Sequence, residues 1–182
     1  MIILILLFSI YLFFILSFLY ATIRLKPHKI DSSCNNEISI IIAIRNGELS
    51  LPNLINYLKN QDYKGPMEFL LIDDESNDRT SEIILNTSLL DNRFKYYSST
   101  EGNKLLNYKK KALDVGIQNA SFNNLLFTDV DCLIPSTWVS TMSNYFSSGY
   151  DYLVGPSIVS NKNKVNNISR FQRIDFLLLM II

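Results

Sequence analysis

Residues 125–135 read LLFTDVDCLIP, an apolar run that ends in two carboxylates, Asp129 and Asp131. The run is short and apolar enough to be a strand buried in a sheet, yet like charges this close repel each other. No basic residue adjoins the pair in the sequence. Something outside the run, such as a cation, a proton or a bound ligand, must therefore stabilise the two carboxylates.

Similar apolar runs precede this stretch and alternate with segments of helical spacing. We expect helices after residue 50, with Pro52 in the first turn, after an Asn77 or Asp78 cap, around Ala112, and from Pro135 onward. The expected strands are residues 38–44, 67–72, 94–97 and 125–128. Strands and helices in this alternation predict an α/β fold, with a mainly parallel sheet flanked by helices.

Residues 1–23 contain no charged side chain and would reach roughly 33 Å as a helix, enough to cross a bilayer core. A cleaved signal peptide is the alternative, but no basic residue precedes the run and no A-x-A-like cleavage site follows it. We therefore predict a retained N-terminal transmembrane helix, a linker over residues 24–36 and one domain over residues 37–182. Arg24, Lys26 and Lys29 follow the helix, which predicts a cytoplasmic domain.

Composition excludes several classes of function. The 17 basic and 17 acidic residues balance, so no charge excess favours nucleic acid as a partner. Cys34 and Cys132 are the two cysteines and imply no disulfide framework. The single histidine, His28, cannot build a histidine-based triad or a histidine-rich metal site. Neither a P-loop nor a dinucleotide-binding glycine motif occurs.

Polar side chains follow three of the expected strands. Arg45 follows the first, Asp73 and Asp74 end the second, and Asp129 and Asp131 follow the last. Ligands of open α/β sheets bind beyond these carboxyl ends, so at least four carboxylates should share one cleft. Oxygen ligands suit Mg²⁺ or Mn²⁺, and Mg²⁺ often binds through carboxylates together with substrate phosphates. A solvated turn or helix cap is the simpler interpretation of each acidic pair taken alone.

Four stretches resemble, in this order, the family-2 glycosyltransferases of GT-A fold. They are ISIIIAIRNGE (38–48), MEFLLIDDESNDRT (67–80), YKKKALDVGI (108–117) and LLFTDVDCLIPSTWV (125–139). The resemblance covers about residues 37 to 156. It implies transfer of a sugar from a nucleotide-diphosphate donor, usually with inversion. The N-terminal anchor suggests a glycolipid, lipid-linked sugar or polysaccharide as acceptor and an inner or plasma membrane as the location, and the Ile-, Asn- and Lys-rich composition suggests a bacterial source.

The resemblance also implies roles for individual residues. Asp129 and Asp131 match the D-x-D motif that holds Mg²⁺ or Mn²⁺ against the donor diphosphate. Lys109 would approach the donor, although its cluster, residues 109–111, is equally well interpreted as a solvated basic face. The remaining nucleotide-sugar-binding positions implied by the resemblance are Ala43, Arg45, Asp73 and Asp74, with Asp74 on the base or ribose.

The family's acceptor-side base lies well downstream of the D-x-D motif. Asp151 and Asp175 are the only acidic residues after Asp131, and neither lies in a matching motif. The sequence ends in the apolar run FLLLMII, typical of a helix cut short. We therefore expect the catalytic base beyond Ile182 and the donor-binding half within the chain.

Two other classes share some of these features. One is a Mg²⁺-dependent phosphotransfer domain, whose strand-end aspartates stand on the first strand rather than late in the chain. The other is a membrane-anchored module that binds a nucleotide sugar without turnover. Metal-dependent hydrolysis of a nucleotide sugar would separate a transferase from both.

Overall fold

The computed structural model describes residues 2–24 and 35–155, which belong to two separate units. The first unit is helix α1, Ile2–Arg24. Its segment Ile3–Ala21 is long and apolar enough to cross a membrane, by length and composition. Predictions for residues 25–34 and 156–182, which include Cys34 and Asp175, lie outside the described residues.

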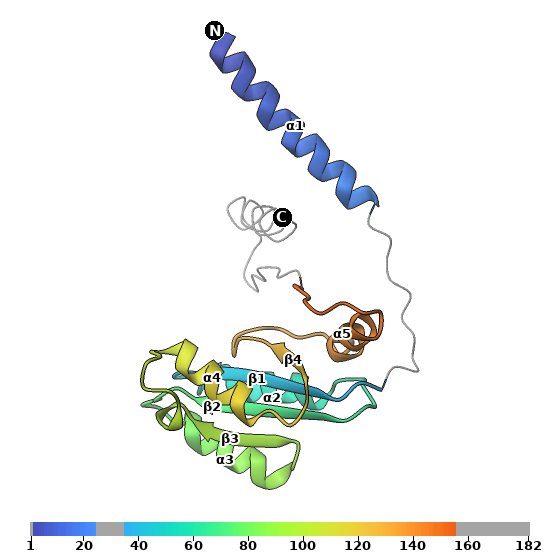
Figure 1. Ribbon diagram of the computed structural model, residues 1–182. Coiled ribbons are helices and arrows are strands. Elements are labelled where there is room, and N and C mark those ends of the chain that lie inside the picture. The colour runs from blue at the N-terminus through green and yellow to red at the C-terminus, as the bar shows by residue number, and fades with distance from the viewer. Residues whose placement is uncertain (1, 25–34, 156–182) are drawn as a thin grey trace. The chain divides into compact units, whose positions relative to one another are not determined.

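The second unit is built on a four-stranded parallel sheet, as predicted. Its strands are β1 (Ile38–Ile44), β2 (Met67–Asp73), β3 (Phe94–Ser98) and β4 (Asn124–Phe127). Figure 1 shows them in the order β3, β2, β1, β4 across the sheet. The bounds of β1 match the prediction, and the other three strands differ from it by one residue at one or both ends. Every pair of neighbouring strands is parallel, so all four carboxyl ends lie at one edge.

Helices and one short 3₁₀ turn connect the strands. They are α2 (Leu51–Lys59), α3 (Thr80–Leu90), the 3₁₀ turn η1 (Ser99–Glu101), α4 (Lys109–Asn119) and α5 (Trp138–Ser147). Pro52 lies in the first turn of α2, as predicted. Two predicted starts are wrong. Arg79, rather than Asn77 or Asp78, occupies the cap position of α3, but its side chain makes no capping bond, and the Asp78 carboxylate accepts from the N–H of Thr80, the first helical residue, over 3.0 Å. Helix α5 begins three residues after Pro135.

Apolar side chains cover both faces of the sheet because neighbouring side chains along a strand point to opposite sides. On one face, Ile40 and Ile42 of β1 lie in the larger core cluster with residues of α2, α3 and α5. On the other face, Ile41 and Ile72 pack with Ala112 of α4. A continuous apolar run in the sequence therefore becomes a strand that is buried on both sides.

Helix α4 lies very close to the sheet at Gly116. A Cβ at this position would lie 2.3 Å from Ile41 Cγ2 and 2.9 Å from Ile72 Cδ1, both below any normal contact. Glycine is therefore required at this crossing. The close packing fixes the position of α4 and hence of Lys109 at its start.

At the amino edge of the sheet, the carboxylate of Glu68 links all four strands. Ser39 Oγ of β1 donates to it over 2.6 Å, and Lys95 Nζ of β3 pairs with it at 2.5 Å. Ser121, just before β4, donates from its backbone N–H (2.6 Å) and its hydroxyl (3.0 Å). Burial alone would raise the pKa of Glu68, but the bonds from Lys95, Ser39 and Ser121 outweigh it and lower that pKa.

We predict that Glu68→Leu lowers the free energy of unfolding by about 3 kcal/mol, because it leaves several buried donors without an acceptor. Glu68→Gln should cost less, since the amide keeps one acceptor oxygen. The measurement is urea unfolding of the full chain in detergent, followed by circular dichroism. Glu82→Gln on the exposed side of α3 is the control and should change stability by less than about 0.5 kcal/mol.

The lowered pKa of Glu68 also predicts a pH dependence. The unfolded chain binds this proton more tightly, so the stabilisation is complete above the ordinary value of 4.5 and is lost as pH falls below it, through the folded pKa. The stability difference between wild type and Glu68→Gln should therefore shrink below pH 4.5. A difference that stays constant down to acid unfolding would contradict this role of the carboxylate.

Candidate functional site

The loops after β1, β2 and β4 converge at the carboxyl edge of the sheet. Ile44 and Asp73, the last residues of β1 and β2, are paired in register, and the Asp74 N–H donates to the Ile44 carbonyl over 2.7 Å. Val130 packs against the loop after β1, because a Cβ on Gly47 would lie 3.2 Å from Val130 Cγ2. The strand ends that the sequence analysis singled out are therefore neighbours.

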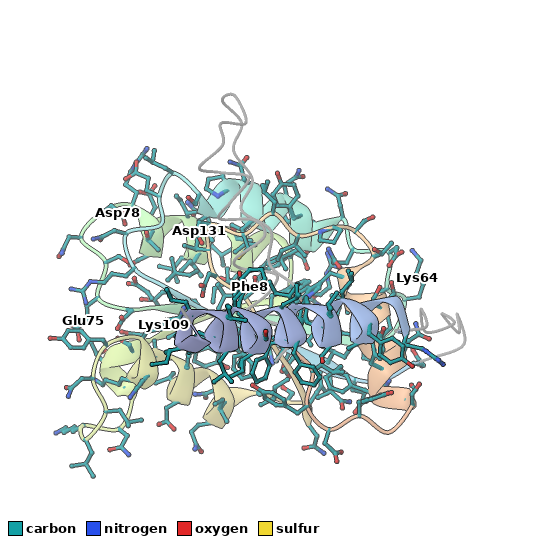
Figure 2. All side chains as sticks on the ribbon, turned by 90° about the horizontal axis from the view of Figure 1, so that it is seen from above. Phe8, Lys64, Glu75, Asp78, Lys109 and Asp131 are labelled. Carbon is teal, nitrogen blue, oxygen red and sulfur yellow. The ribbon has the colours of Figure 1, made fainter. Side chains whose placement is uncertain are left out.

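Figure 2 shows the labelled polar residues of this edge. Glu75, Asp78, Lys109 and Asp131 lie toward one end of the folded unit, and Lys64, which precedes β2, lies toward the other. The site therefore occupies the end at which parallel strands terminate, where ligands bind in open α/β sheets.

The two aspartates of the D-x-D stretch face outward because the chain stays extended past β4. Val130 and Cys132 are half-buried and pack against the larger core cluster, whereas Asp129 and Asp131 are exposed. This period of two puts both carboxylates on the same side of the segment, away from the core. The apolar residue between them anchors the pair.

The loops after β1 and β2 are joined by hydrogen bonds between backbone and side chains. Three consecutive N–H groups of the first loop donate to side chains of the second: Asn46 to Ser76 Oγ (2.9 Å), Gly47 to Thr80 Oγ1 (2.8 Å) and Glu48 to Asp78 Oδ2 (3.0 Å). In return the Asn77 N–H donates to Asn46 Oδ1 over 2.9 Å. The two loops therefore form one fixed wall of the site.

Charged groups of this wall stay ionised. The hydrogen bond from Arg79, whose guanidinium lies 2.6 Å from Glu48 Oε1, lowers the pKa of Glu48. The hydrogen bond with Thr80 lowers the pKa of Asp78. The sequence analysis did not identify these contacts. The density of Ser, Thr, Asn and Asp in residues 73–81 was the available signal, since one helix cap needs only one such side chain.

Asp73 and Asp74 have different surroundings, although both are almost completely buried. The Asp73 carboxylate accepts from Ser81 Oγ over 2.6 Å and from the Ser76 N–H over 3.2 Å. Asp74 is only 6% exposed, yet within residues 2–24 and 35–155 its carboxylate has no hydrogen-bond or ion-pair partner. Ser99 Oγ is the one fully buried side-chain N or O atom without a partner among the described residues, so the Asp74 carboxylate keeps some access to water. Asp73 therefore holds the loop in place, and Asp74 has the surroundings of a ligand-binding group.

Lys109, the first residue of α4, forms an ion pair with Asp129. Both side chains are 56% exposed, so water screens the pair. This contact brings the basic cluster beside the D-x-D stretch, as the phosphate-contact interpretation requires. Asp131 is exposed, and in the described part of the chain its carboxylate has no partner.

Of the four strand-end carboxylates, only Asp129 and Asp131 are predicted to hold the metal. No group of three or more His, Cys, Asp or Glu side chains suited to a metal occurs within the residues that the structure describes. The physical reason is that Asp73 is occupied by Ser76 and Ser81. Asp129 and Asp131 remain, and two carboxylates suit a Mg²⁺ or Mn²⁺ ion that completes its shell with water and phosphate oxygens. The donor set therefore fits the metal that the resemblance implies.

The remaining predicted site residues lie along β1 and just after it. Ala43 is half-buried, pairs in register with Ile72 and packs against the α4 face of the sheet. Arg45 is exposed, and its guanidinium has no hydrogen-bond or ion-pair partner among the described residues. Arg45 and Asp74 thus offer one free cation and one free anion at neighbouring strand ends.

The sequence profile described as "Glycosyl transferase family 2" matches residues 39–181, well over half of the chain. This chain belongs to glycosyl transferase family 2. The four motifs that predicted the family fall within the match, apart from residue 38. The GT-A-type fold predicted from them agrees with the parallel sheet and flanking helices of the second unit.

Two curated relatives of this glycosyltransferase-family chain are named for undecaprenyl-linked substrates. A GalNAc(5)-diNAcBac-PP-undecaprenol beta-1,3-glucosyltransferase of Campylobacter jejuni is 26% identical over 130 residues, which cover 71% of this chain and 41% of the relative. An undecaprenyl-phosphate 4-deoxy-4-formamido-L-arabinose transferase of Pectobacterium atrosepticum is 32% identical over 117 residues, covering 63% and 35%. The chain spans less than half the length of either relative.

Solved structures share the fold. A mannosyltransferase of Pyrobaculum calidifontis, solved with GDP-Man and Mn²⁺, superposes with a TM-score of 0.62 at 17% identity, over 73% of this chain and 39% of that one. S. aureus TarS residues 1–349, solved with UDP-GlcNAc, give a TM-score of 0.50 at 25% identity, over 62% and 31%. Both support the GT-A arrangement of the sheet and helices.

We predict different effects on stability for the two adjacent aspartates. Asp73→Ala should lower the free energy of unfolding by about 1–3 kcal/mol, because Ser81 Oγ and the Ser76 N–H lose their acceptor. Asp74→Ala should leave it nearly unchanged, since no donor within the described residues loses its acceptor. Urea unfolding of the full chain is the measurement. Equal losses in both variants would show that Asp74 has a partner within the protein.

Proposed function

We propose that this chain forms the donor-binding half of a glycosyltransferase that moves a sugar from a nucleotide-diphosphate sugar to a lipid-linked acceptor. The observation that carries the proposal is the carboxylate of Asp74, which belongs to a residue only 6% exposed and has no partner among the described residues. It lies where the loops of the D-x-D stretch and of β1 converge. The undecaprenyl-linked substrates named for the relatives support a lipid-linked acceptor. The nucleotide sugars bound in the structural neighbours support the donor class.

In this proposal the nucleoside lies over the ends of β1 and β2. The Asp74 carboxylate accepts hydrogen bonds from the base or ribose, so the nucleoside supplies the donors that this carboxylate does not have among the described residues. Arg45 contributes its free guanidinium, which can stack on a base or pair with phosphate. Ala43 forms part of the floor, where its small side chain leaves room, and Asp73 holds the neighbouring backbone.

Asp129 and Asp131 hold the divalent ion, Mg²⁺ or Mn²⁺, on the diphosphate side of the site. When bound, this ion supplies positive charge next to the leaving diphosphate. Lys109 moves its ammonium from Asp129 to a phosphate oxygen, a short exchange because the two side chains already touch. We propose inversion at the anomeric carbon, as the family resemblance implies. We assign no catalytic base, since Asp151 is exposed and lies in no matching motif.

The proposed location is the cytoplasmic face of a bacterial inner or plasma membrane. Helix α1 is the candidate anchor, and its basic end at Arg24 supports retention of the domain on the cytoplasmic side. Nucleotide-sugar donors and the headgroups of lipid-linked acceptors would then meet at one surface. The anchor also supplies the membrane contact that lipid-linked acceptors require.

Calorimetry of nucleoside diphosphate binding tests the site. With Mn²⁺, Asp131→Asn should weaken binding by roughly tenfold to 100-fold, and Asp129→Asn should do so less severely. Without Mn²⁺ the losses should disappear, because the carboxylates act through the metal. Asp74→Ala should weaken binding to a similar degree whether or not Mn²⁺ is present, since its partner is the nucleoside.

Asp62→Asn is the matched control, because Asp62 is exposed near the opposite edge of the sheet. It should bind like wild type under every condition. Undiminished Mn²⁺-dependent binding in Asp131→Asn would contradict the metal site. A loss in Asp74→Ala that occurred only with a sugar donor, and not with the free diphosphate, would contradict the nucleoside position.

A further inference from the structure

The segment of residues 101–111, EGNKLLNYKKK, links η1 to α4 and presents large apolar side chains to solvent. Leu105 is 88% exposed and Tyr108 is 78% exposed. The segment is nevertheless held by its own contacts. The Leu105 N–H donates to Asn103 Oδ1 and the Leu106 N–H to the Asn103 carbonyl, each over 3.0 Å. An ordered turn therefore displays these side chains.

Two local preferences are broken where this segment enters α4. Tyr108, the cap residue, has φ 54° and ψ −145°, which is strained for a residue with a Cβ, and its side chain makes no capping bond. Lys109, Lys110 and Lys111 fill the first turn, which contains no acidic residue. A helix start favours negative charge, so three cations there destabilise it. Features that cost stability and bury little surface point to a partner.

The charges indicate that this partner is anionic. Within the described residues, Lys104, Lys110 and Lys111 have no ion-pair partner, and Lys109 pairs with Asp129 at the edge of the donor site. The chain as a whole has a net charge of zero, so this basic surface is a local concentration. A nucleotide diphosphate alone would satisfy Lys109 but would leave Leu105 and Tyr108 in water. A bilayer interface suits all of them, because lysine stems and tyrosine rings partition there with their polar ends in water.

We propose that residues 101–111 dock on an anionic phospholipid surface and hold the mouth of the donor site against it. This inference rests on the proposed function, in which α1 anchors the chain and the acceptor is lipid-linked. Each lysine near an anionic surface shifts the ratio of docked to undocked domain about fivefold.

The test uses the full chain reconstituted in vesicles, with one environment-sensitive fluorophore on a single cysteine. Cys34→Ser and Cys132→Ser provide the background, and Leu105→Cys carries the probe. Leu89→Cys is the matched control, because Leu89 is also a highly exposed leucine (83%). It lies at the end of α3 that is directed toward the amino edge of the sheet. Vesicles contain phosphatidylcholine alone or mixed with phosphatidylglycerol, and nitroxide-labelled lipid serves as the quencher.

We expect lipid quenching of the probe at position 105 but not at 89, and stronger quenching when phosphatidylglycerol is present. Lys104→Gln with Lys110→Gln should lower the docked-to-undocked ratio about 25-fold, at fivefold per charge. The exposed pair Lys59→Gln with Lys64→Gln is the charge-matched control and should leave quenching unchanged. Calorimetry with nucleoside diphosphate on the same proteins reports the donor site separately.

Three results would contradict the proposal that residues 101–111 dock on lipid. One is equal quenching at positions 105 and 89, and another is quenching at 105 that does not respond to phosphatidylglycerol or to loss of the lysines. The third is a change in the fluorescence of the probe at position 105 when free nucleoside diphosphate is added in detergent. This result would show that the segment binds the donor nucleotide rather than lipid. If nucleotide binding persists in any of these cases, the docking proposal fails alone. If wild type binds no nucleotide, the proposed function fails instead.

Discussion

The buried carboxylate of Glu68 is the contact that fixes the four strands against one another. It accepts from Ser39 of β1, pairs with Lys95 of β3 and accepts twice from Ser121 before β4. Because side chains alternate along a strand, a slip of one residue would invert both faces of the sheet. Register fixed at the amino edge thus determines which residues emerge at the carboxyl edge. The position of Asp74 beside the end of β1 is a consequence.

The chemistry of the site follows from how neighbouring acidic residues are divided between structural and ligand-binding roles. Asp73 and Asp74 are adjacent and almost equally buried, but only Asp73 has donors from its own loop and helix. Asp129 and Asp131 are separated by Val130, whose packing against the core turns both outward. In each case an anchored residue positions the carboxylates of the site: Asp73 lies beside Asp74, and Val130 lies between Asp129 and Asp131.

Much of this architecture could be predicted from the sequence. The apolar runs gave the order and type of the strands, with β1 at its observed bounds, because strands buried on both faces are continuous in hydrophobicity. The start of α3 and the role of Asp73 were not predictable in the same way. The start of α3 depends on hydrogen bonds from a loop some 30 residues away, such as that from the Gly47 N–H to Thr80 Oγ1. The role of Asp73 depends on how its own loop folds back, so that Ser76 and Ser81 reach its carboxylate. Likewise, Glu68 in MEFLLID gave no sign that its partners come from three other segments.

We propose above all that a nucleotide-diphosphate sugar binds across the carboxyl ends of β1, β2 and β4, with a divalent ion at the D-x-D stretch. Crystals of the chain grown with Mn²⁺ and a nucleoside diphosphate, measured at the manganese absorption edge, would locate both groups directly. We expect one anomalous peak beside Asp131, the nucleoside next to Asp74, and Lys109 turned from Asp129 to phosphate. Nucleotide bound at the amino edge near Glu68, or a manganese peak away from Asp129 and Asp131, would contradict the account.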